Sequence, residues 1–472
     1  MLRKTKIICT IGPACETEEI LSGMCRAGMN VARLNFSHGN HEDHLRRIEL
    51  IRRVRDQLNL PIAIMLDTKG PEYRIRTFRE GKVTLADGAL FSLTTEDVEG
   101  DEHRVSVTYQ KLTEELDPGD TVLINNGLVI LKVEEIRGPE VVCRVQNGGV
   151  LSDRKSMNFP GKVLRQDFLS EQDKKDLLFG IENEVDFVAA SFVSCREDVQ
   201  AMRDLLDQNG GKQIDIIAKI ENRSGVEKIE EICEVADGIM VARGDLGVEI
   251  PFMEVPSLQK YLISKCRMLG KRVITATEML ESMIQNPRPT RAEISDVANA
   301  VYDGSSAIML SGETAAGKFP VQAVKTMADT ALFTEKGIDY AERFHTMQFT
   351  IRNNLDAVSH ATCAMAVDVN AKAIVVNSLS GRTARMVSRF RCPVNIIGTT
   401  TDARAWRKLN LSWGVTPVLT ESYSSMDVMF WQDLKIARER FDLQAGDNVV
   451  LTGGQINGEP GNTNTIKVES IR

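Results

Sequence analysis

Three features that would place the chain in a special class of protein are missing from it. None of its nine cysteines forms a CxxC pair and their spacing does not repeat, so we expect reduced, buried thiols in an intracellular protein. No stretch approaches about 18 uninterrupted apolar residues, the length that a membrane-spanning helix needs. The apolar run that follows the basic start MLRKTK is too short for a signal peptide. We therefore expect a cytoplasmic protein with no membrane partner.

An excess of positive charge is also lacking. The formal net charge is −8 and the isoelectric point about 5.5, which argues against nucleic acid or an anionic membrane as the main partner. What is present is an ordinary globular composition, with 42% hydrophobic and 26% charged residues. The 472 residues allow for about three domains.

Short apolar runs alternate with amphipathic helical patterns through most of the first two thirds of the chain. Near-continuous hydrophobic strands separated by helices indicate a parallel sheet that is covered on both faces. Eight such units predict an α/β fold of the (β/α)8 TIM barrel type, although an open doubly wound sheet stays possible because periodicity alone cannot show closure. The predicted strands span residues 5–12, 30–36, 62–68, 185–193, 214–221, 238–243, 272–277 and 306–310.

The third unit of this pattern is interrupted. After LDTKGPE the sequence changes to short alternating strands separated by Gly-containing turns, which predicts a small β-barrel domain inserted at 71–167. The catalytic barrel would then comprise 1–70 and 168–345, and a C-terminal open α/β domain is expected at 346–472. An insertion after the carboxyl end of a barrel strand lies at the mouth of the barrel, where it can act as a lid.

Polar side chains stand at the carboxyl ends of six or more of the predicted barrel strands. Barrel enzymes carry their chemistry at this end, so a convergence of this size predicts an active site rather than a set of unrelated helix caps. The residues are Arg33, Asn35, Ser37, Asp67, Thr68, Ser191, Lys219, Glu221, Asp245, Thr277, Ser311 and Glu313.

The stretch QIDIIAKIENRSG carries two opposite charges at the end of an apolar strand. Lys219 and Glu221 are two residues apart, so strand geometry points both side chains the same way. A buried ion pair by itself stabilises poorly, and Asp245 follows the next strand, so Glu221 and Asp245 are predicted to share a cation. Two carboxylates without a Cys/His cluster favour Mg²⁺ or Mn²⁺. With Arg33 and Lys219 facing the metal, an anionic ligand and phosphoryl transfer are favoured; the alternative is that Glu221 only pairs with Lys219.

The six histidines give no sign of a nucleophilic triad with serine or cysteine. Two of them, His41 and His44, lie on a predicted helix, and we expect both at the surface.

A set of long motifs runs in order through the chain, namely CTIGP, RLNFSHG, LDTKGPE, KIEN, MVARGDLGVEIP, ITATEML, NPRPTRAE, DVANAVYDG and MLSGETAAGKFP. These motifs closely resemble those of the pyruvate kinase family, and the match extends through the whole chain. The resemblance implies transfer of a phosphoryl group from phosphoenolpyruvate to ADP, giving ATP and pyruvate, the last step of glycolysis. It also implies a homotetramer, on which the residues themselves give no evidence.

The resemblance also implies roles for the residues at the barrel mouth. Arg33 and Lys219 would hold the phosphoryl group, and Lys219 would also neutralise the developing enolate. Glu221 and Asp245 would ligate the divalent metal. Gly244, Asp245 and Thr277 would line the phosphoenolpyruvate site, with Thr277 near the point where the enolate is protonated.

A monovalent cation and a nucleotide are implied in the same way. Glu72 is the residue that accompanies K⁺ dependence in the family. The K⁺ site would comprise Asn35, Ser37, Asp67 and Thr68. The nucleotide site would comprise Arg74, Lys155, Asn35 and His38. Three positions depart from the family pattern without removing a catalytic group, namely Tyr73, Ser156 and Glu278.

The C-terminal region contains NSLSGRTARMV at a predicted strand-to-helix turn, which is a suitable cradle for a phosphate group. A Gly-rich loop at 453–465 would close over it. This resembles the family's site for an allosteric effector, which would be a sugar bisphosphate, a sugar monophosphate, AMP or none; an ordinary turn with a long hairpin loop is the alternative. The effector residues would be Ser378, Ser380, Gly381, Arg382, Thr383, Gly458 and Gly461.

Two rival functions remain open at this point. A metal-dependent lyase or aldolase acting on 2-oxo acids would share the carboxylates and an arginine, but it would not need Arg74, Lys155 or a lid to grip a nucleotide. A non-catalytic sensor of phosphorylated metabolites would be expected to have a damaged barrel mouth, and no expected group is missing.

Overall fold

The computed structural model describes residues 2–162, 164, 167–454 and 463–472. All eight predicted barrel strands form, and they close into a parallel barrel in the order β1-β17-β16-β15-β14-β13-β3-β2, which excludes the open sheet. Every strand is shorter than its predicted apolar run, because residues at one or both ends of each run lie outside the paired strand. The strands are β1 (Lys6–Thr10), β2 (Val31–Asn35), β3 (Ala63–Asp67), β13 (Phe187–Ala190), β14 (Asp215–Ile220), β15 (Gly238–Ala242), β16 (Arg272–Ala276) and β17 (Ala307–Leu310).

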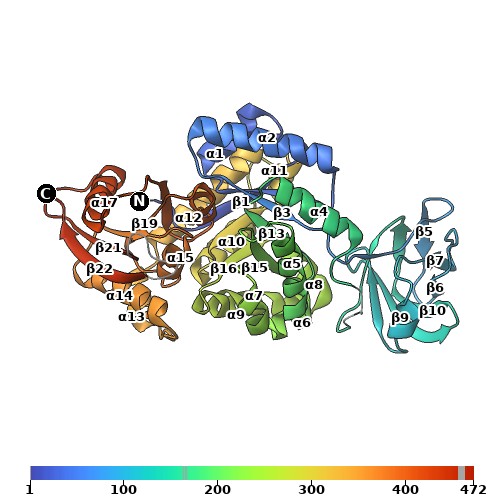
Figure 1. The fold of residues 1–472 in the computed structure, drawn as a ribbon. Coiled ribbons are helices and arrows are strands. Elements are labelled where there is room, and N and C mark those ends of the chain that lie inside the picture. Colours follow the sequence, from blue (N-terminus) through green and yellow to red (C-terminus); the bar gives the residue numbers. More distant parts are fainter. Residues whose placement is uncertain (1, 163, 165–166, 455–462) are drawn as a thin grey trace.

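Helices surround this barrel (Figure 1). The predicted capping box is present, since Thr290 accepts from the backbone N–H of Glu293 at the start of α10. The α-helices are α1 (Glu18–Ala27), α2 (His41–Leu58), α4 (Glu171–Glu182), α5 (Arg196–Gln208), α6 (Arg223–Glu227), α7 (Ile229–Val235), α8 (Arg243–Glu249), α9 (Val255–Met268), α10 (Arg291–Asp303), α11 (Gly312–Ala315) and α12 (Pro320–Lys336). Short 3₁₀ helices are η1 (Pro13–Cys15), η2 (Phe252–Glu254) and η3 (Glu281–Ile284).

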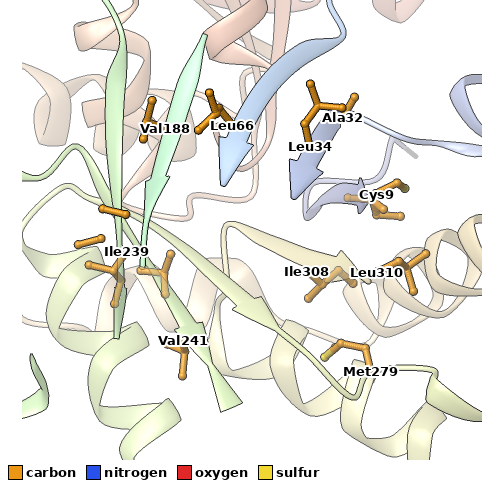
Figure 2. Packing of buried hydrophobic residues seen from close by; sticks show 14 of the residues in the cluster. Cys9, Ala32, Leu34, Leu66, Val188, Ile239, Val241, Met279, Ile308 and Leu310 are labelled. Atoms are coloured by element: carbon orange, nitrogen blue, oxygen red, sulfur yellow. The ribbon is translucent and has the colours of Figure 1, made fainter. Parts of the chain in front are cut away.

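The barrel strands bury both of their faces in alternation. One set of side chains packs outward against the helices, and Figure 2 shows members such as Leu66, Val188 and Ile308 on different strands of the barrel. The alternate set fills the barrel interior, as Met65 and Ile217 do. This period of two follows from the pleat of a strand and explains why the runs read as continuously apolar.

The segment between β3 and α4 forms the predicted β-rich insert. Seven of its strands form a sheet in the order β4-β12-β8-β9-β10-β6-β7, and β5 pairs with β11. A bridge between Ile75 and Val107 joins the continuations of the two edge strands, so the sheet curls around one apolar core. The elements are β4 (Tyr73–Arg74), β5 (Lys82–Leu85), β6 (Leu90–Thr94), β7 (Arg104–Ser106), α3 (Leu112–Glu115), β8 (Thr121–Ile124), β9 (Val129–Arg137), β10 (Glu140–Asn147), β11 (Gly149–Ser152) and β12 (Ser156–Asn158).

The C-terminal unit is an open α/β sheet in the order β20-β19-β18-β21-β22, with β22 antiparallel to its neighbour. The fold class is therefore confirmed, while the residue limits of the three domains stay predictions. No helix in the described ranges is both long and apolar enough to cross a membrane. The elements are α13 (Tyr340–Thr346), α14 (Asn354–Asp368), β18 (Ala373–Asn377), α15 (Arg382–Ser388), β19 (Asn395–Thr400), α16 (Ala403–Leu409), β20 (Val415–Leu419), α17 (Met426–Phe441), β21 (Asn448–Gly454) and β22 (Thr463–Ser470).

The C-terminal unit packs against the amino-terminal end of the barrel. Leu411 belongs to the cluster that fills the barrel interior. Lys408 Nζ lies 2.7 Å from Asp215 Oδ1 at the start of β14, and Lys6 Nζ donates to the Val415 carbonyl at 2.7 Å. The opposite, carboxyl end of the barrel faces away from this contact, next to the β-rich insert.

Candidate active site

The polar groups at the barrel mouth continue the rows of side chains that fill the barrel interior. On β14, Ile217 packs inside the barrel, so alternation puts Lys219 and Glu221 on the same inner side. On β3, Met65 is inside and Asp67 follows in the same row. The same alternation turns two more residues inward, Arg33 on β2 and Ser191 after β13.

These rows form a buried chain of alternating charges. Lys219 Nζ lies 3.0 Å from Glu221 Oε1 and 3.2 Å from Asp67 Oδ1. Arg33 Nε lies 2.5 Å from the other oxygen of Asp67. Lys219 also donates to Ser191 Oγ at 2.6 Å. Three strands and the turn after β13 therefore hold two cations and two carboxylates in fixed positions at one point of the mouth.

The surroundings of each group set its charge. Burial acts to lower the pKa of Lys219, but the carboxylates of Asp67 and Glu221 outweigh it and raise that pKa above its ordinary value. Burial acts to raise the pKa of Asp67, and the charges of Arg33 and Lys219 outweigh it and lower that pKa. Lys219 and Asp67 are therefore both ionised at neutral pH.

Glu221 is the group whose charge is least compensated. Its side chain is fully buried, and burial together with the charge of Asp245 raises its pKa to about 7 in spite of Lys219. Its Oε2 accepts from the backbone N–H of Phe192 at 2.6 Å. Its Oε1 forms the ion pair with Lys219 but accepts no hydrogen bond in the described structure. A buried carboxylate oxygen without a hydrogen bond is well suited to bind a metal cation.

The site fits a divalent metal such as Mg²⁺, which needs only a few ligands from the protein. Asp245, in the first turn of α8, is the second carboxylate, and its charge acts on Glu221. The described residues contain no group of three His, Cys, Asp or Glu side chains that could hold a metal. Two carboxylates with the remaining positions left for water and substrate oxygens are typical of Mg²⁺.

Thr277 is clamped at the end of β16. Its Oγ1 accepts from the Gly244 N–H at 2.8 Å and donates to the Ala276 carbonyl at 2.6 Å. Both Thr277 and Glu278 have left-handed backbones, with φ of 68° and 54°, a conformation that side chains other than glycine seldom adopt. Arg243 donates to the Thr277 carbonyl at 2.6 Å and so helps to hold the turn. Arg243 was not predicted from the sequence.

The residues expected to bind K⁺ lie at the ends of two adjacent strands. Asn35 and Asp67 are register partners of β2 and β3. Asn35 Oδ1 accepts from the Ser37 N–H at 3.2 Å, and Thr68 Oγ1 accepts from the Ser191 N–H at 3.2 Å. The four expected ligands are thus brought together, but Asp67 also forms ion pairs with Arg33 and Lys219, which the sequence did not reveal.

The expected nucleotide residues fall into two places. Arg74 on β4 is opposite Ser156 of β12, and the N–H of Ile75 donates to the Lys155 carbonyl at 3.0 Å, so Lys155 is one position away from the register partner of Arg74. Arg74 makes a two-pronged ion pair with Glu72, with both N···O distances 2.9 Å. His38 is exposed in the turn after β2. Its carbonyl is hydrogen-bonded to the ring of His44 on α2.

A cavity of about 520 Å³ opens beside Asp245 and Gly244. Asn126, from the β-rich insert, lines it together with Glu278 of the barrel, so the insert reaches the mouth. A hydrogen bond of 2.9 Å from Asn158 Nδ2 to Glu249 Oε1 joins the insert to α8. The position of the insert is that of the predicted lid.

The expectation that His41 and His44 are surface residues is wrong for His44. This side chain is 1% exposed, and burial lowers its pKa to about 4. It stacks on Phe36 with ring centres 3.9 Å apart. His41 is half-buried and pairs with Asp176 at 2.6 Å. The helix that carries them turns this face toward the barrel, which the short apolar pattern around them did not indicate.

The predicted phosphate cradle forms the turn between β18 and α15. Gly381 has a φ of 76°, which a glycine adopts without strain. Ser378 Oγ accepts from the Thr383 N–H at 3.3 Å, and Thr383 Oγ1 lies 2.6 Å from Thr463 Oγ1 on β22. Ser380 and Arg382 belong to the same turn. The two remaining expected residues, Gly458 and Gly461, lie outside the described residues.

A buried carboxyl group lies next to this cradle and was not predicted. Asp433 of α17 is fully buried, and its Oδ2 accepts from Asn377 Nδ2 at 2.6 Å. Its Oδ1 has no partner in the described structure. Burial raises the pKa of Asp433 from 3.8 to about 7 despite the hydrogen bond from Asn377.

This shift predicts a pH-dependent stability. The folded protein keeps the Asp433 proton up to a higher pH than the unfolded chain does, so the free energy of unfolding falls as pH rises from about 4 to about 7. The loss from this group amounts to at most about 4 kcal/mol. Asp433→Asn should flatten the pH dependence of the thermal midpoint, while Asp442→Asn, at the exposed end of the same helix, should not. Equal slopes in all three proteins would contradict the assignment.

Comparisons with known proteins agree along the length of the chain. Residues 2–324 match the family model of the pyruvate kinase barrel domain, and residues 356–469 match that of the pyruvate kinase alpha/beta domain. A pyruvate kinase of Clostridium acetobutylicum is 46% identical over 475 residues, covering 100% of both chains. One of Geobacillus stearothermophilus is 46% identical over 477 residues, covering 100% of this chain and 81% of its own.

A solved structure gives the same result. The crystal structure of a pyruvate kinase from Cryptosporidium parvum superposes with a TM-score of 0.94 at 39% identity, covering 99% of this chain and 96% of the other. With both domain models, full-length relatives and this fold in agreement, the chain belongs to the pyruvate kinase family.

Proposed function

We propose that the protein transfers the phosphoryl group of phosphoenolpyruvate to ADP, giving ATP and pyruvate, in a reaction that requires Mg²⁺ and K⁺. The observation that carries this proposal is the buried chain Arg33–Asp67–Lys219–Glu221 at the barrel mouth. Phosphoryl transfer needs positioned positive charge more than a covalent nucleophile, and this chain supplies it.

Arg33 and Lys219 are the groups that bind the transferring phosphoryl oxygens. Asp67 lies between them and fixes both, with N···O distances of 2.5 and 3.2 Å, so their charges need little reorganisation during the reaction. Lys219 would also neutralise the enolate that forms when the phosphoryl group leaves. Because the pKa of Lys219 is raised, it acts as a fixed charge and not as a proton donor at neutral pH.

Glu221 and Asp245 would hold Mg²⁺, or Mn²⁺ in its place. When bound, this ion supplies positive charge to the carboxylate and phosphate oxygens of the substrate. The backbone of Gly244, which donates to Thr277 beside Asp245, shapes the wall of the same site.

Thr277 is proposed to stand near the carbon of the enolate that receives a proton. Its hydroxyl is fixed between Gly244 and Ala276, so it can orient a water or pass a proton. Thr277→Val should lower kcat by about 10²-fold or more, and Thr277→Ser, which keeps the hydroxyl, should retain most of it. A Thr277→Val rate equal to that of the wild type in steady-state assays would remove Thr277 from the mechanism.

The monovalent and nucleotide sites complete the proposal. Asn35, Ser37, Asp67 and Thr68 would bind K⁺ with oxygen ligands from adjacent strand ends. Glu72 fixes the guanidinium of Arg74. Arg74 and Lys155 on the insert would contact the nucleotide phosphates, and His38 and Asn35 would contribute from the barrel.

Regulation and assembly are proposed at a coarser level. The cradle at 378–383 would bind a phosphorylated effector, whose identity as a sugar bisphosphate, a sugar monophosphate or AMP is left to the experiment. A cytoplasmic homotetramer is the proposed working form.

The experiment measures pyruvate formation from phosphoenolpyruvate with Mg²⁺, with and without ADP and K⁺. We expect turnover that requires ADP and rises with K⁺, and a change in the rate with one of the phosphorylated effectors. Pyruvate release that does not depend on ADP would contradict phosphoryl transfer to a nucleotide, and no turnover under any of these conditions would favour the metal-dependent lyase or aldolase.

A further inference from the structure

Three arginines meet in a pocket that none of the proposed steps uses. Arg267 lies in the last turn of α9, Arg343 lies on α13, and Arg391 follows α15. Phe390 and Trp413 line the same pocket. Since α9 leads into the start of β16, the pocket lies at the amino-terminal end of the barrel, against the C-terminal unit and away from the mouth.

Arg391 is held in place by neutral acceptors only. It is 6% exposed, and its guanidinium lies 4.8 Å from the ring centre of Trp413. It donates to the carbonyls of Ser388 at 2.8 Å and Gly304 at 3.0 Å, and to Ser306 Oγ at 3.0 Å. Its Nε is buried without a partner in the described structure.

The hydrogen-bond donors of Arg267 are less well satisfied than those of Arg391. It is 7% exposed, its Nε is also buried without a partner among the described residues, and its Nη2 contacts the thioether sulfur of Met347. Thioether sulfur is a weak acceptor. Arg343, exposed at the rim, donates to the Tyr302 carbonyl at 2.8 Å. Both buried arginines therefore have hydrogen-bonding capacity left over.

Within the described ranges none of the three arginines forms an ion pair with a carboxylate. A buried acid of this region, Glu335, spends its two oxygens on the backbone N–H groups of Lys4 and Thr5, at 2.8 and 2.6 Å. Burial lowers the pKa of Arg267 to about 10, and burial with the charge of Arg267 lowers that of Arg391. Uncompensated buried cations of this kind are costly unless an anion joins them.

We propose that this pocket binds a phosphate group, free or as the monoester of a small molecule, between the guanidinium groups of Arg267, Arg391 and Arg343. Guanidinium forks match the oxygen geometry of phosphate, and several of them around one group are typical of such sites. The proposal is independent of the reaction at the barrel mouth and of the cradle at 378–383.

Binding requires a local rearrangement. The pocket leaves about 10 Å³ of free space, room for about one water molecule. Met347 occupies the place toward which Arg267 points, and it is followed by a stretch without regular secondary structure at 348–353. A phosphate oxygen is a far stronger acceptor than the thioether, so we expect the ligand to displace Met347 and the exposed Arg343 to close over it.

Trp413 provides a probe at the site itself. The chain has three tryptophans, so Trp406→Phe and Trp431→Phe leave Trp413 as the sole indole fluorophore. In this background we titrate inorganic phosphate and, separately, methyl phosphate, each against sodium chloride at equal ionic strength. A saturable change in fluorescence beyond the chloride control is expected; a response to both ligands indicates a monoester site and a response to inorganic phosphate alone a site for the free ion.

Matched variants locate the response. Arg267→Met should weaken the phosphate affinity by at least about tenfold, because a charge-assisted fork is lost. Lys265→Gln, which removes a charge from the same helix outside the pocket, should not weaken it. If circular dichroism shows that Arg267→Met does not fold, Arg343→Met, which changes an exposed position, takes its place in the comparison. The proposal is overturned by no response beyond chloride, or by an equal affinity in the folded arginine variant.

Discussion

Lys219→Met is expected to lower kcat for pyruvate formation by about 10³–10⁵-fold, the effect of removing a cation from the transferring phosphoryl group. The side chain is 9% exposed and is fixed by Asp67, Glu221 and Ser191, so its charge is already in place before the reaction begins. Methionine keeps the length and the apolar stem but removes the charge. Steady-state kinetics with phosphoenolpyruvate and ADP measure the loss.

The fold of this variant has to be checked, because breaking a buried ion pair costs about 3–5 kcal/mol. Two features limit that cost here. Asp67 keeps its contact with Arg33, and Glu221, whose pKa is about 7, can take up a proton. Lys212→Met, at an exposed position just before the same strand, is the matched control. A folded Lys219→Met protein with a kcat within tenfold of wild type would contradict the role assigned to Lys219.

Glu221→Gln is expected to lower kcat by at least about 10³-fold through loss of the divalent cation. The amide keeps the shape of the side chain but is a much weaker ligand than the carboxylate. We expect the metal-free variant to fold, with a change of about 1–3 kcal/mol in its free energy of unfolding. The change is small because the ionised carboxylate is already disfavoured at this buried position.

The control for this variant is Glu227→Gln, at an exposed position on the neighbouring α6. Thermal midpoints with and without Mg²⁺ separate loss of metal from loss of fold. An active Glu221→Gln enzyme with unchanged Mg²⁺ dependence would show that the metal is held elsewhere.

The rows of inward-facing side chains explain how much of the site the sequence could predict. A strand has a period of two, so once Ile217 is assigned to a buried strand, Lys219 and Glu221 must share its face. A second rule, that barrel enzymes carry their chemistry at the carboxyl ends of the strands, selected Arg33 and Asp67. Eight apolar runs were enough for the barrel type, but closure itself needed the pairing of β1 with β17.

The partners within the site could not be predicted in the same way. That Asp67 bridges Arg33 and Lys219 depends on the rotamers of three side chains from three strands. The N–H that holds Glu221 belongs to Phe192, whose φ of 58° is set by the turn and not by its residue type. Thr10, which ends the first strand, accepts from Arg33 at 2.8 Å and could have been found by the strand-end rule.

The prediction for His44 was wrong for a related reason. An isolated histidine on a helix was assigned to solvent, whereas its ring packs on Phe36, which comes from the preceding strand end. Contacts between side chains from different elements are not visible in a local pattern. The arginine pocket at the other end of the barrel is of the same kind, because Arg267 and Arg391 are 124 positions apart in the sequence.

The most direct test of the account measures Mn²⁺ binding by electron paramagnetic resonance. The proteins compared are the wild type, Lys219→Met and Glu221→Gln. The account predicts that Lys219→Met binds Mn²⁺ at least as tightly as wild type, because a cation next to the ligand is gone, while its kcat falls by about 10³–10⁵-fold. Glu221→Gln should lose the bound Mn²⁺. Loss of Mn²⁺ from Lys219→Met, or its retention by Glu221→Gln, would contradict the division of roles between the two residues.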